Sequence, residues 1–298
     1  MKRSTIVVWL SLLIAALALV ATGAGLFWPG GNGPFDFTTL RGQTARIYGQ
    51  GLYHYDTLFM GAGNRGVDLV VLVLGIPLLL VSFWLYGRGS LRGALLLVGT
   101  LGYFFYVYAS VTFGAAYNEL FLVYVALFSA CTFAFVLAFS SIDRQMLAAR
   151  FSPGVPRRSL AIFMFVGGVV TLFVWGLPLV AALVAQQPPD LLDSYTTMVT
   201  YALDLALITP STFLVGVLVL RREPLGYVIA LPLLVIIVLL LPQIGAQTVM
   251  QLSAGVALTP GQIVGPVAGF AVLGLPGAWL LIALLRNVSE QETGSAGT

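Results

Sequence analysis

Residues 5–28 read TIVVWLSLLIAALALVATGAGLFW and contain no charged side chain. A helix of about 20 apolar residues is long enough to cross the hydrocarbon core of a bilayer. The run follows Lys2 and Arg3, a basic start that secretory signal peptides share. Because it is longer than the apolar region of an ordinary signal, we interpret it as a retained first membrane helix, with a cleaved signal as the alternative.

The whole chain has the composition of a protein that is solvated by lipid. Hydrophobic residues make up 59% of its 298 residues and charged residues only 8%, whereas soluble domains carry about 25% charged residues. Seven further apolar runs of membrane-spanning length predict an all-α, polytopic integral membrane protein with eight transmembrane helices. After the first, the expected spans are 67–86, 91–113, 119–139, 160–185, 195–220, 226–250 and 263–285.

The segments outside the spans differ in length and composition. We assign residues 1–286 to one transmembrane domain that includes an extracytoplasmic loop at 29–65. Residues 287–298, rich in Ser, Glu, Gly and Thr, are predicted to form a disordered cytoplasmic tail. Within the loop, apolar residues spaced among polar ones predict a short interfacial helix near 39–55. No repeat is evident between the two halves of the sequence.

Basic residues are unequally distributed between the two sets of loops. With the N-terminus in the cytoplasm, eleven lie on the cytoplasmic side and three outside. Because cytoplasmic loops carry an excess of Lys and Arg, we predict that both termini are cytoplasmic. The eleven are Lys2, Arg3, Arg88, Arg92, Arg144, Arg150, Arg157, Arg158, Arg221, Arg222 and Arg286, and the three are Arg41, Arg46 and Arg65. We expect the membrane to be a prokaryotic plasma membrane.

The chain lacks residues that several kinds of site require. Cys131 is the only cysteine and His54 the only histidine, which excludes an internal disulfide, a CxxC pair and a haem held by two histidines. Lys2 is the only lysine, so a retinal Schiff base within a span is excluded. No basic run points to nucleic acid. We expect no metal and no cofactor, and as partners the bilayer and a small-molecule or lipid ligand.

Polar residues inside the apolar runs are the main functional candidates, because lipid disfavours them unless they face a cavity or a partner. Asp204 is the carboxylate that lies deepest in a predicted span. On a regular helix it shares one face with Thr197, Tyr201, Ile208 and Ser211. Three glutamines of the seventh span repeat at i, i+4 and i+8, namely Gln243, Gln247 and Gln251. The two stripes predict a polar pocket in the outer half of the membrane, and a hydrogen bond that merely joins two helices is the alternative.

The stretch 48–68, YGQGLYHYDTLFMGAGNRGVD, is predicted to cover this pocket as a lid, because its aromatic residues would be poorly solvated if exposed. The candidate pocket or substrate-binding residues are Tyr53, His54, Asp56, Asp68, Asn118, Glu119, Tyr201, Asp204, Gln243 and Gln247. Asp68 and Glu119 have an alternative role as acids that cap helix N-termini. The tyrosines of the third span, Tyr103 and Tyr106 among them, have one as an aromatic belt at the membrane interface.

Three classes of function remain open at this stage. A carrier for a small molecule, with proton coupling as an option, is favoured by the two polar stripes and one deep carboxylate. A membrane enzyme that acts at the outer face on a lipid or lipid-linked substrate is the second. GT-C glycosyltransferases are similar in placing an acid in the first outer loop, but the chain has no paired-acid motif. An accessory or sensory subunit without catalytic chemistry is the third.

The distribution of basic residues generates a prediction about sidedness. A reporter fused after Thr298 that fluoresces only in the cytoplasm should be active, and alkaline phosphatase fused at the same place should be inactive. Fusions within the loop at 29–65 should give the reverse pattern. Phosphatase activity at the C-terminal fusion would contradict the predicted orientation.

Overall fold

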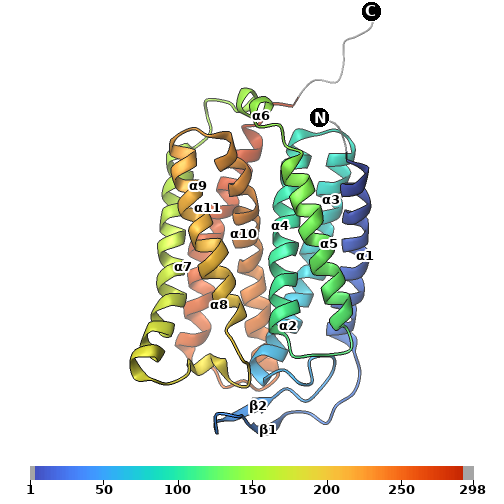
Figure 1. Ribbon diagram of the computed structural model, residues 1–298, viewed down its shortest axis with the longest axis vertical. Coiled ribbons are helices and arrows are strands. Elements are labelled where there is room, and N and C mark those ends of the chain that lie inside the picture. The colour runs from blue at the N-terminus through green and yellow to red at the C-terminus, as the bar shows by residue number, and fades with distance from the viewer. Residues whose placement is uncertain (1–3, 291–298) are drawn as a thin grey trace, which may run out of the picture.

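A computed structural model describes residues 4–290 of the chain (Figure 1). Within these residues, eight helical spans are long and apolar enough to cross a membrane, as the sequence predicts. The four spans of the first half are Thr5–Phe27 (α1), Leu58–Gly87 (α2, η1 and α3), Leu91–Gly114 (α4) and Phe121–Ser140 (α5). Those of the second half are Arg157–Ala185 (α7), Val199–Leu220 (α8, η3 and α9), Pro224–Ser253 (α10) and Pro260–Arg286 (α11).

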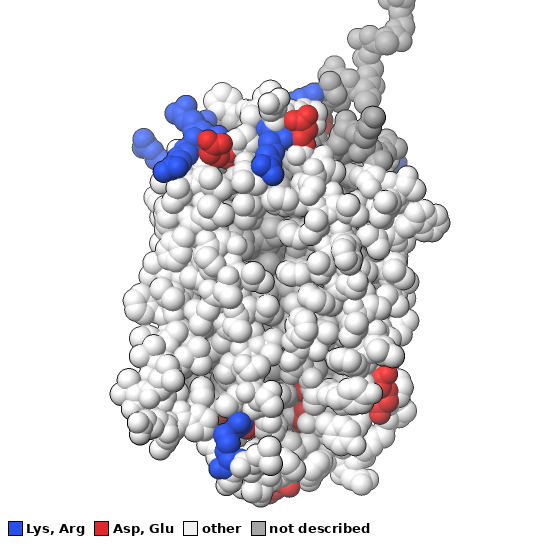
Figure 2. All heavy atoms as spheres, viewed as in Figure 1, with Lys and Arg blue, Asp and Glu red and all other residues white. Residues whose placement is uncertain are grey.

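Charged side chains occupy the two ends of the bundle. On the face drawn in Figure 2, blue and red groups lie at the ends and the band between them is uncoloured. Both described termini lie at one end, because Ser4 N donates to the Tyr86 hydroxyl at 2.8 Å and Glu290 accepts from Ser90 at 2.7 Å. We call this the terminus end. The opposite end carries the loop at 29–57 and is called the hairpin end.

The hairpin end differs from its prediction. The stretch that predicted an interfacial helix forms an antiparallel hairpin of β1 (Phe35–Thr38) and β2 (Thr44–Ile47), so that prediction is wrong. Leu40 is fully exposed in the connecting loop and therefore cannot belong to an apolar helix face. Exposed and buried residues alternate along β2, and Gly42 takes a positive φ of 76° in the turn. Alternation and a glycine turn favour a hairpin over a helix.

The second span begins nine residues earlier than hydropathy predicts, at Leu58 instead of Val67. The Thr57 hydroxyl caps the helix by accepting from Met60 N at 3.3 Å. The added turns are rich in glycine because they pack closely on α10: a Cβ at Gly66 would overlap the backbone of Gln247. Close helix approach through small residues is common inside membranes. The longer helix also places Arg65 in a span instead of the loop.

Short segments close the terminus end. The helix α6 (Arg144–Arg150) lies beside the end of the described chain, where Ser289 N donates to the Arg150 carbonyl at 2.9 Å. Glu290 accepts from the backbone of Leu91 and Arg92, both at 3.0 Å, and so caps the start of α4. Residues 287–290 are therefore packed instead of forming the beginning of a disordered tail. The rest of that predicted tail, 291–298, lies outside the described residues.

The two halves share a backbone plan that the sequence does not reveal. Each second span contains a π-helical turn, η1 (Val71–Gly75) and η3 (Asp204–Ile208), offset by 133 residues from Val71 to Asp204. Each turn is followed at the same offset by a proline at the start of the next helix, Pro77 and Pro210. In Figure 1 the first four spans and the last four form two neighbouring four-helix groups.

The connection to the third span of each half repeats as well. Gly89 and Arg222, again 133 residues apart, both take a positive φ, 83° and 61°. The next residue donates its N–H to the carbonyl of Leu85 at 3.2 Å in one half and of Leu218 at 2.9 Å in the other. Inside the following helices a Cβ at Gly93 or Gly226 would crowd the corresponding Leu85 or Leu218. The same turn is therefore built from different side chains.

The halves meet where α4 crosses α10, and the contacts there are reciprocal. A Cβ at Gly99 would press on Val235, and one at Gly102 would overlap Pro232. By the 133-residue offset, Gly99 corresponds to Pro232 and Gly102 to Val235. Gly99 thus contacts the residue equivalent to Gly102, and Gly102 contacts the residue equivalent to Gly99. Such an exchange is expected about a two-fold axis. Because the helices run the same way in each half, that axis lies along the bundle.

This crossing generates a stability prediction. Gly102→Ala should lower the midpoint of thermal unfolding, because the new methyl forces α4 and α10 apart and overpacking costs about 1–3 kcal/mol. Gly245→Ala in α10 is the matched control, since no atom lies within 4 Å of a Cβ built there. The midpoints are measured in detergent by intrinsic fluorescence. Equal midpoints for the two variants would contradict the close crossing.

Candidate functional site

Asp204 lies in the interior of the bundle, 8% exposed, at the first residue of the π-helical turn η3. Its Oδ1 accepts a hydrogen bond from the Tyr106 hydroxyl of α4 at 2.8 Å. A π-helical turn inside a membrane helix frequently marks a functional position. Asp204 therefore joins the two halves through a tyrosine and not through a cation.

The π-helical turn corrects the predicted face of the sixth span. On a regular helix Ile208 and Ser211 would follow Asp204 towards the interior. The turn inserts one extra residue, so Thr209 and Thr212 are buried in their place, with 5% and 7% exposure. The Thr212 hydroxyl donates to the Thr209 carbonyl at 2.7 Å. The polar face continues past Asp204, but it is shifted by one position.

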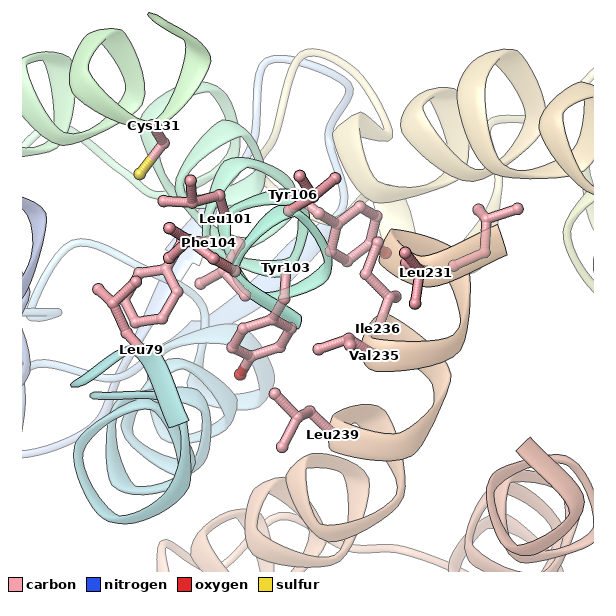
Figure 3. Close-up of a cluster of buried hydrophobic side chains, with 14 of the residues drawn as sticks. Leu79, Leu101, Tyr103, Phe104, Tyr106, Cys131, Leu231, Val235, Ile236 and Leu239 are labelled. Carbon is pink, nitrogen blue, oxygen red and sulfur yellow. The ribbon is translucent and has the colours of Figure 1, made fainter. Parts of the chain in front are cut away.

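Gln243 of α10 is the second buried polar group at the junction between the halves. Its Oε1 accepts from the Tyr103 hydroxyl of α4 at 2.9 Å. Figure 3 shows Tyr103 and Tyr106 on the side of α4 that faces α10, among apolar residues of both helices. One turn of α4 thus supplies the hydroxyl partners of both Asp204 and Gln243. Two tyrosine contacts join the stripes to α4, in place of the direct hydrogen bond between the stripes that was the alternative to a pocket.

Asp68 is the buried carboxylate of the first half, 7% exposed in α2. It lies three residues before η1, whereas Asp204 begins η3, so the two acids are one turn apart in the shared plan. Its Oδ2 accepts from the Tyr53 hydroxyl at 2.7 Å. Gly25 of α1 leaves the space that this carboxylate occupies, because a Cβ there would overlap it. Asp68 is well inside its helix, so it is not an N-terminal cap.

Asp56 ties the hairpin end together. Its fully buried carboxylate accepts at Oδ1 from Ala116 N at 2.9 Å and from the Tyr195 hydroxyl at 2.6 Å. Ala116 follows α4 and Tyr195 precedes α8, so Asp56 joins one connection from each half. Burial raises the pKa of Asp56 to about 6 despite these two hydrogen bonds. Its Oδ2 has no hydrogen-bond partner among the described residues.

Residues 48–57 of the predicted lid pack on the bundle, whereas residues 58–68 belong to the membrane-spanning helix α2. Leu52, Tyr53 and Asp56 are almost completely buried, and Tyr55 is exposed. The hairpin adds a further tie, because an Arg41 Nη donates to the carbonyls of Asp193 at 2.6 Å and Tyr195 at 2.9 Å. Direct hydrogen bonds therefore join the loop at 29–57 to both halves of the bundle.

The remaining predicted residues have local roles. His54 contacts the Gly51 carbonyl through Nδ1 at 2.9 Å, and its ring packs at a tilt against Tyr55. Asn118 closes a turn by accepting from Leu120 N at 3.0 Å, and Glu119 beside it is exposed. Tyr201 is half-buried and packs on Trp175, with ring centroids 4.4 Å apart. The side chain of Gln247 makes no hydrogen bond within the described part of the chain, but its backbone contacts Gly66. None of these residues hydrogen-bonds Asp204.

A polar cavity of about 160 Å³ lies at the hairpin end of the first half. Its lining comes from the end of α1, the glycine loop that follows, the segment after β2, and α2. The lining residues are Gly25, Leu26, Trp28, Gly30, Tyr48, Gln50, Gly51, Leu52, Tyr53 and Arg65. Of the predicted site residues only Tyr53 lines it, and Asp204 does not. A second, apolar cleft lies at the end of α7, around Leu183 and Gln186.

Sequence reasoning missed the partners of the buried acids. An aromatic belt at the membrane interface was the alternative role of Tyr103 and Tyr106, although their spacing of three residues places them on one helix face. Tyr195 was placed within a span, and Arg65 in a loop. The signal that would have identified the first pair is a tyrosine stripe in a helix that has no exposed side. The absence of a metal stays a prediction, although no three His, Cys, Asp or Glu side chains of residues 4–290 come together.

No protein-family model, curated protein or solved structure matches the chain. The class of protein therefore follows from architecture alone. Eight apolar helices of spanning length and an interior sealed by hydroxyl–carboxylate contacts are the architecture of a multi-pass membrane protein.

The buried carboxylate of Asp56 generates a pH prediction. Since its pKa is raised to about 6 in the folded protein, the folded state binds a proton more tightly than the unfolded chain does. The stability that Asp56 contributes is therefore present below about pH 4 and is lost as the pH rises through 6. Asp56→Asn should remove this part of the pH dependence and should unfold at the wild-type temperature or higher at pH 7.5.

Asp56→Ala should instead lower the free energy of unfolding by about 1–3 kcal/mol at every pH, because Ala116 N and the Tyr195 hydroxyl lose their acceptor. Its unfolding temperature should fall accordingly. Asp36→Asn is the matched control, because Asp36 is exposed on the hairpin and paired only with Arg46. Thermal unfolding between pH 4 and 8 measures all three variants. If Asp56→Asn were as damaging as Asp56→Ala at pH 7.5, the ionised carboxylate would be required and the prediction would be wrong.

Proposed function

We propose that the protein is a membrane carrier for a small molecule, with the hairpin end outside the cell and Asp204 as the group that couples movement to a proton. The observation that carries this proposal is the pair of π-helical turns at corresponding places in the two halves, each with a buried carboxylate beside it. Carriers commonly consist of two repeats, and their sites lie where helices are interrupted between the repeats.

The arrangement of the halves supports a rocking movement. They meet along α4, α10 and α2, and α4 approaches α10 most closely where Gly99 and Gly102 face Val235 and Pro232. A contact of this kind leaves each four-helix group intact while the angle between the groups changes. The hydrogen bonds from Tyr106 to Asp204 and from Tyr103 to Gln243 cross the same junction. Those two contacts are the ones that such a movement would break or exchange.

The chemistry of Asp204 suits proton coupling. Its only described hydrogen-bond donor within the first half is the Tyr106 hydroxyl, and no described Lys or Arg forms an ion pair with it. A carboxylate without a cationic partner at membrane depth is costly, so taking up a proton relieves that cost. A proton on Asp204 would make it a neutral carboxyl, which accepts from the Tyr106 hydroxyl more weakly than the ionised carboxylate does. Protonation would therefore weaken one tie between the halves.

Uptake into proteoliposomes tests the proposal. The purified protein is reconstituted in vesicles, an inward proton gradient is imposed, and the vesicle contents are compared by mass spectrometry after incubation with a defined mixture of metabolites. Wild type should accumulate at least one compound in a gradient-dependent way, and Asp204→Asn should lose that accumulation while unfolding at the wild-type temperature. Asp36→Asn, at the exposed hairpin, should behave as wild type.

The outcomes separate the classes of function. Accumulation that Asp204→Asn leaves unchanged would remove the assigned role of this residue. No accumulation of any compound, together with chemical change in the vesicle lipid, would favour an enzyme that acts on lipid at the outer face. No accumulation and no lipid change would favour an accessory subunit.

A further inference from the structure

The polar cavity at the hairpin end has the features of a binding site and is separate from Asp204. It is partly enclosed, and its polar lining residues are Tyr48, Gln50, Tyr53 and Arg65. Backbone contacts shape its wall: Gly51 N donates to the Gly30 carbonyl at 2.9 Å, and Gly31 bridges to Gln50. A Cβ at Gly31 would overlap the backbone of Gly49, so the segments approach closely only because glycine is present. The cavity is thus preformed by the backbone.

Arg65 supplies the positive charge of this cavity. Its Nη1 donates to the Tyr48 hydroxyl at 3.1 Å and its Nη2 to the Leu26 carbonyl at 3.0 Å. A guanidinium carries five N–H groups, so most remain free for a ligand. Among the described residues Arg65 forms no ion pair, and its side chain is half-buried. The two protein contacts hold the planar group in place.

The acid nearest to Arg65 along the helix, Asp68, does not form an ion pair with it. Asp68 lies one turn further into α2, and its carboxylate accepts from the Tyr53 hydroxyl. Tyr53 is part of the cavity wall, and Asp68 is not among the lining residues. His54 faces the Gly51 carbonyl through Nδ1. The cavity therefore presents one strong donor group and no carboxylate in its lining.

These observations select a class of ligand. A fixed guanidinium with free N–H groups matches the geometry of carboxylate and phosphate oxygens. A volume of about 160 Å³ corresponds to about five water molecules at about 30 Å³ each. We propose that this cavity binds a small oxyanionic group, a carboxylate or phosphate, through Arg65. The group belongs either to a soluble acid or to the head group of an anionic lipid, since the cavity lies at the end of the spans.

That oxyanions are the substrates of the carrier rests on the proposed function. The test of anion binding does not. Binding is measured at equilibrium and no transport is involved. Anion binding without uptake of any compound would refute the carrier alone. Uptake without anion binding would refute the anion site alone.

The experiment measures thermal unfolding of the full chain in phosphatidylcholine nanodiscs at constant ionic strength. Sodium acetate, sodium phosphate and sodium chloride are titrated in parallel. A ligand that binds the folded state raises the unfolding midpoint, on the order of 5 °C when the site is well saturated. Acetate or phosphate should raise the midpoint above the chloride baseline. Arg65→Gln should abolish the rise, and Arg46→Gln, which alters an exposed arginine of the same end, should retain it.

The lipid arm repeats the measurement with phosphatidylglycerol in the nanodiscs. An Arg65-dependent rise that appears only with this lipid would assign the oxyanion to a lipid head group. A rise with free acetate or phosphate would assign it to a soluble acid. A rise that Arg65→Gln retains, or no rise under any condition, would overturn the proposal.

A second measurement covers the case in which Arg65→Gln does not fold. Wild-type protein is treated with phenylglyoxal, which modifies accessible arginines, with and without the anion that gives the largest rise. Peptide mass spectrometry then reports modification at each arginine of the hairpin end. The anion should protect Arg65 and leave Arg41 and Arg46 unprotected. Equal modification of Arg65 with and without the anion would overturn the proposal.

Discussion

The interior of this bundle depends on tyrosine hydroxyls that donate hydrogen bonds to buried polar groups. Hydrocarbon offers no hydrogen-bond partner, so each buried carboxylate or amide must find one within the protein. Asp68, Asp204 and Gln243 each accept from a tyrosine, and Asp56 does so at the hairpin end. A hydroxyl satisfies a carboxylate without adding charge, and an aromatic ring packs well among leucine and valine. The tyrosines therefore make it possible to keep acids in the bundle without a matching set of lysines and arginines.

This solution explains why α4 is the most buried of the spans. It carries the hydroxyls that reach into the second half, and it crosses α10 at positions without bulky side chains. Gly99 and Gly102 bring the two helices together, and Tyr103 and Tyr106, one turn further, reach polar groups on α10 and η3. Close packing and hydrogen bonding are thus consecutive features of one helix. A larger residue at either glycine would move both hydroxyls away from their acceptors.

Much of the architecture followed from the sequence because it depends on hydropathy, and most of the site did not. Runs of apolar residues predicted eight spans, and the burial of Asp204 followed from its position within one. The start of the second span was missed because glycines and Arg65 mask a helix that Thr57 caps. The π-helical turns escaped prediction because an extra residue per turn leaves the composition unchanged. The duplicated plan was hidden because equivalent backbone turns use Gly89 in one half and Arg222 in the other, so identity of side chains is lost while geometry is kept.

The shared plan also makes the differences between the halves informative. In the first half the carboxylate lies three residues before the π-helical turn and is held by Tyr53, which belongs to the hairpin-end segment. In the second half it begins the turn and is held by Tyr106, which belongs to the opposite half. Three residues correspond to about 4.5 Å along a helix. Asp68 is therefore linked to the hairpin-end segment, and Asp204 to the junction between the two halves. A symmetric backbone thus carries two acids with different partners, so a change in the hairpin-end segment and a change at the junction would act on different carboxylates.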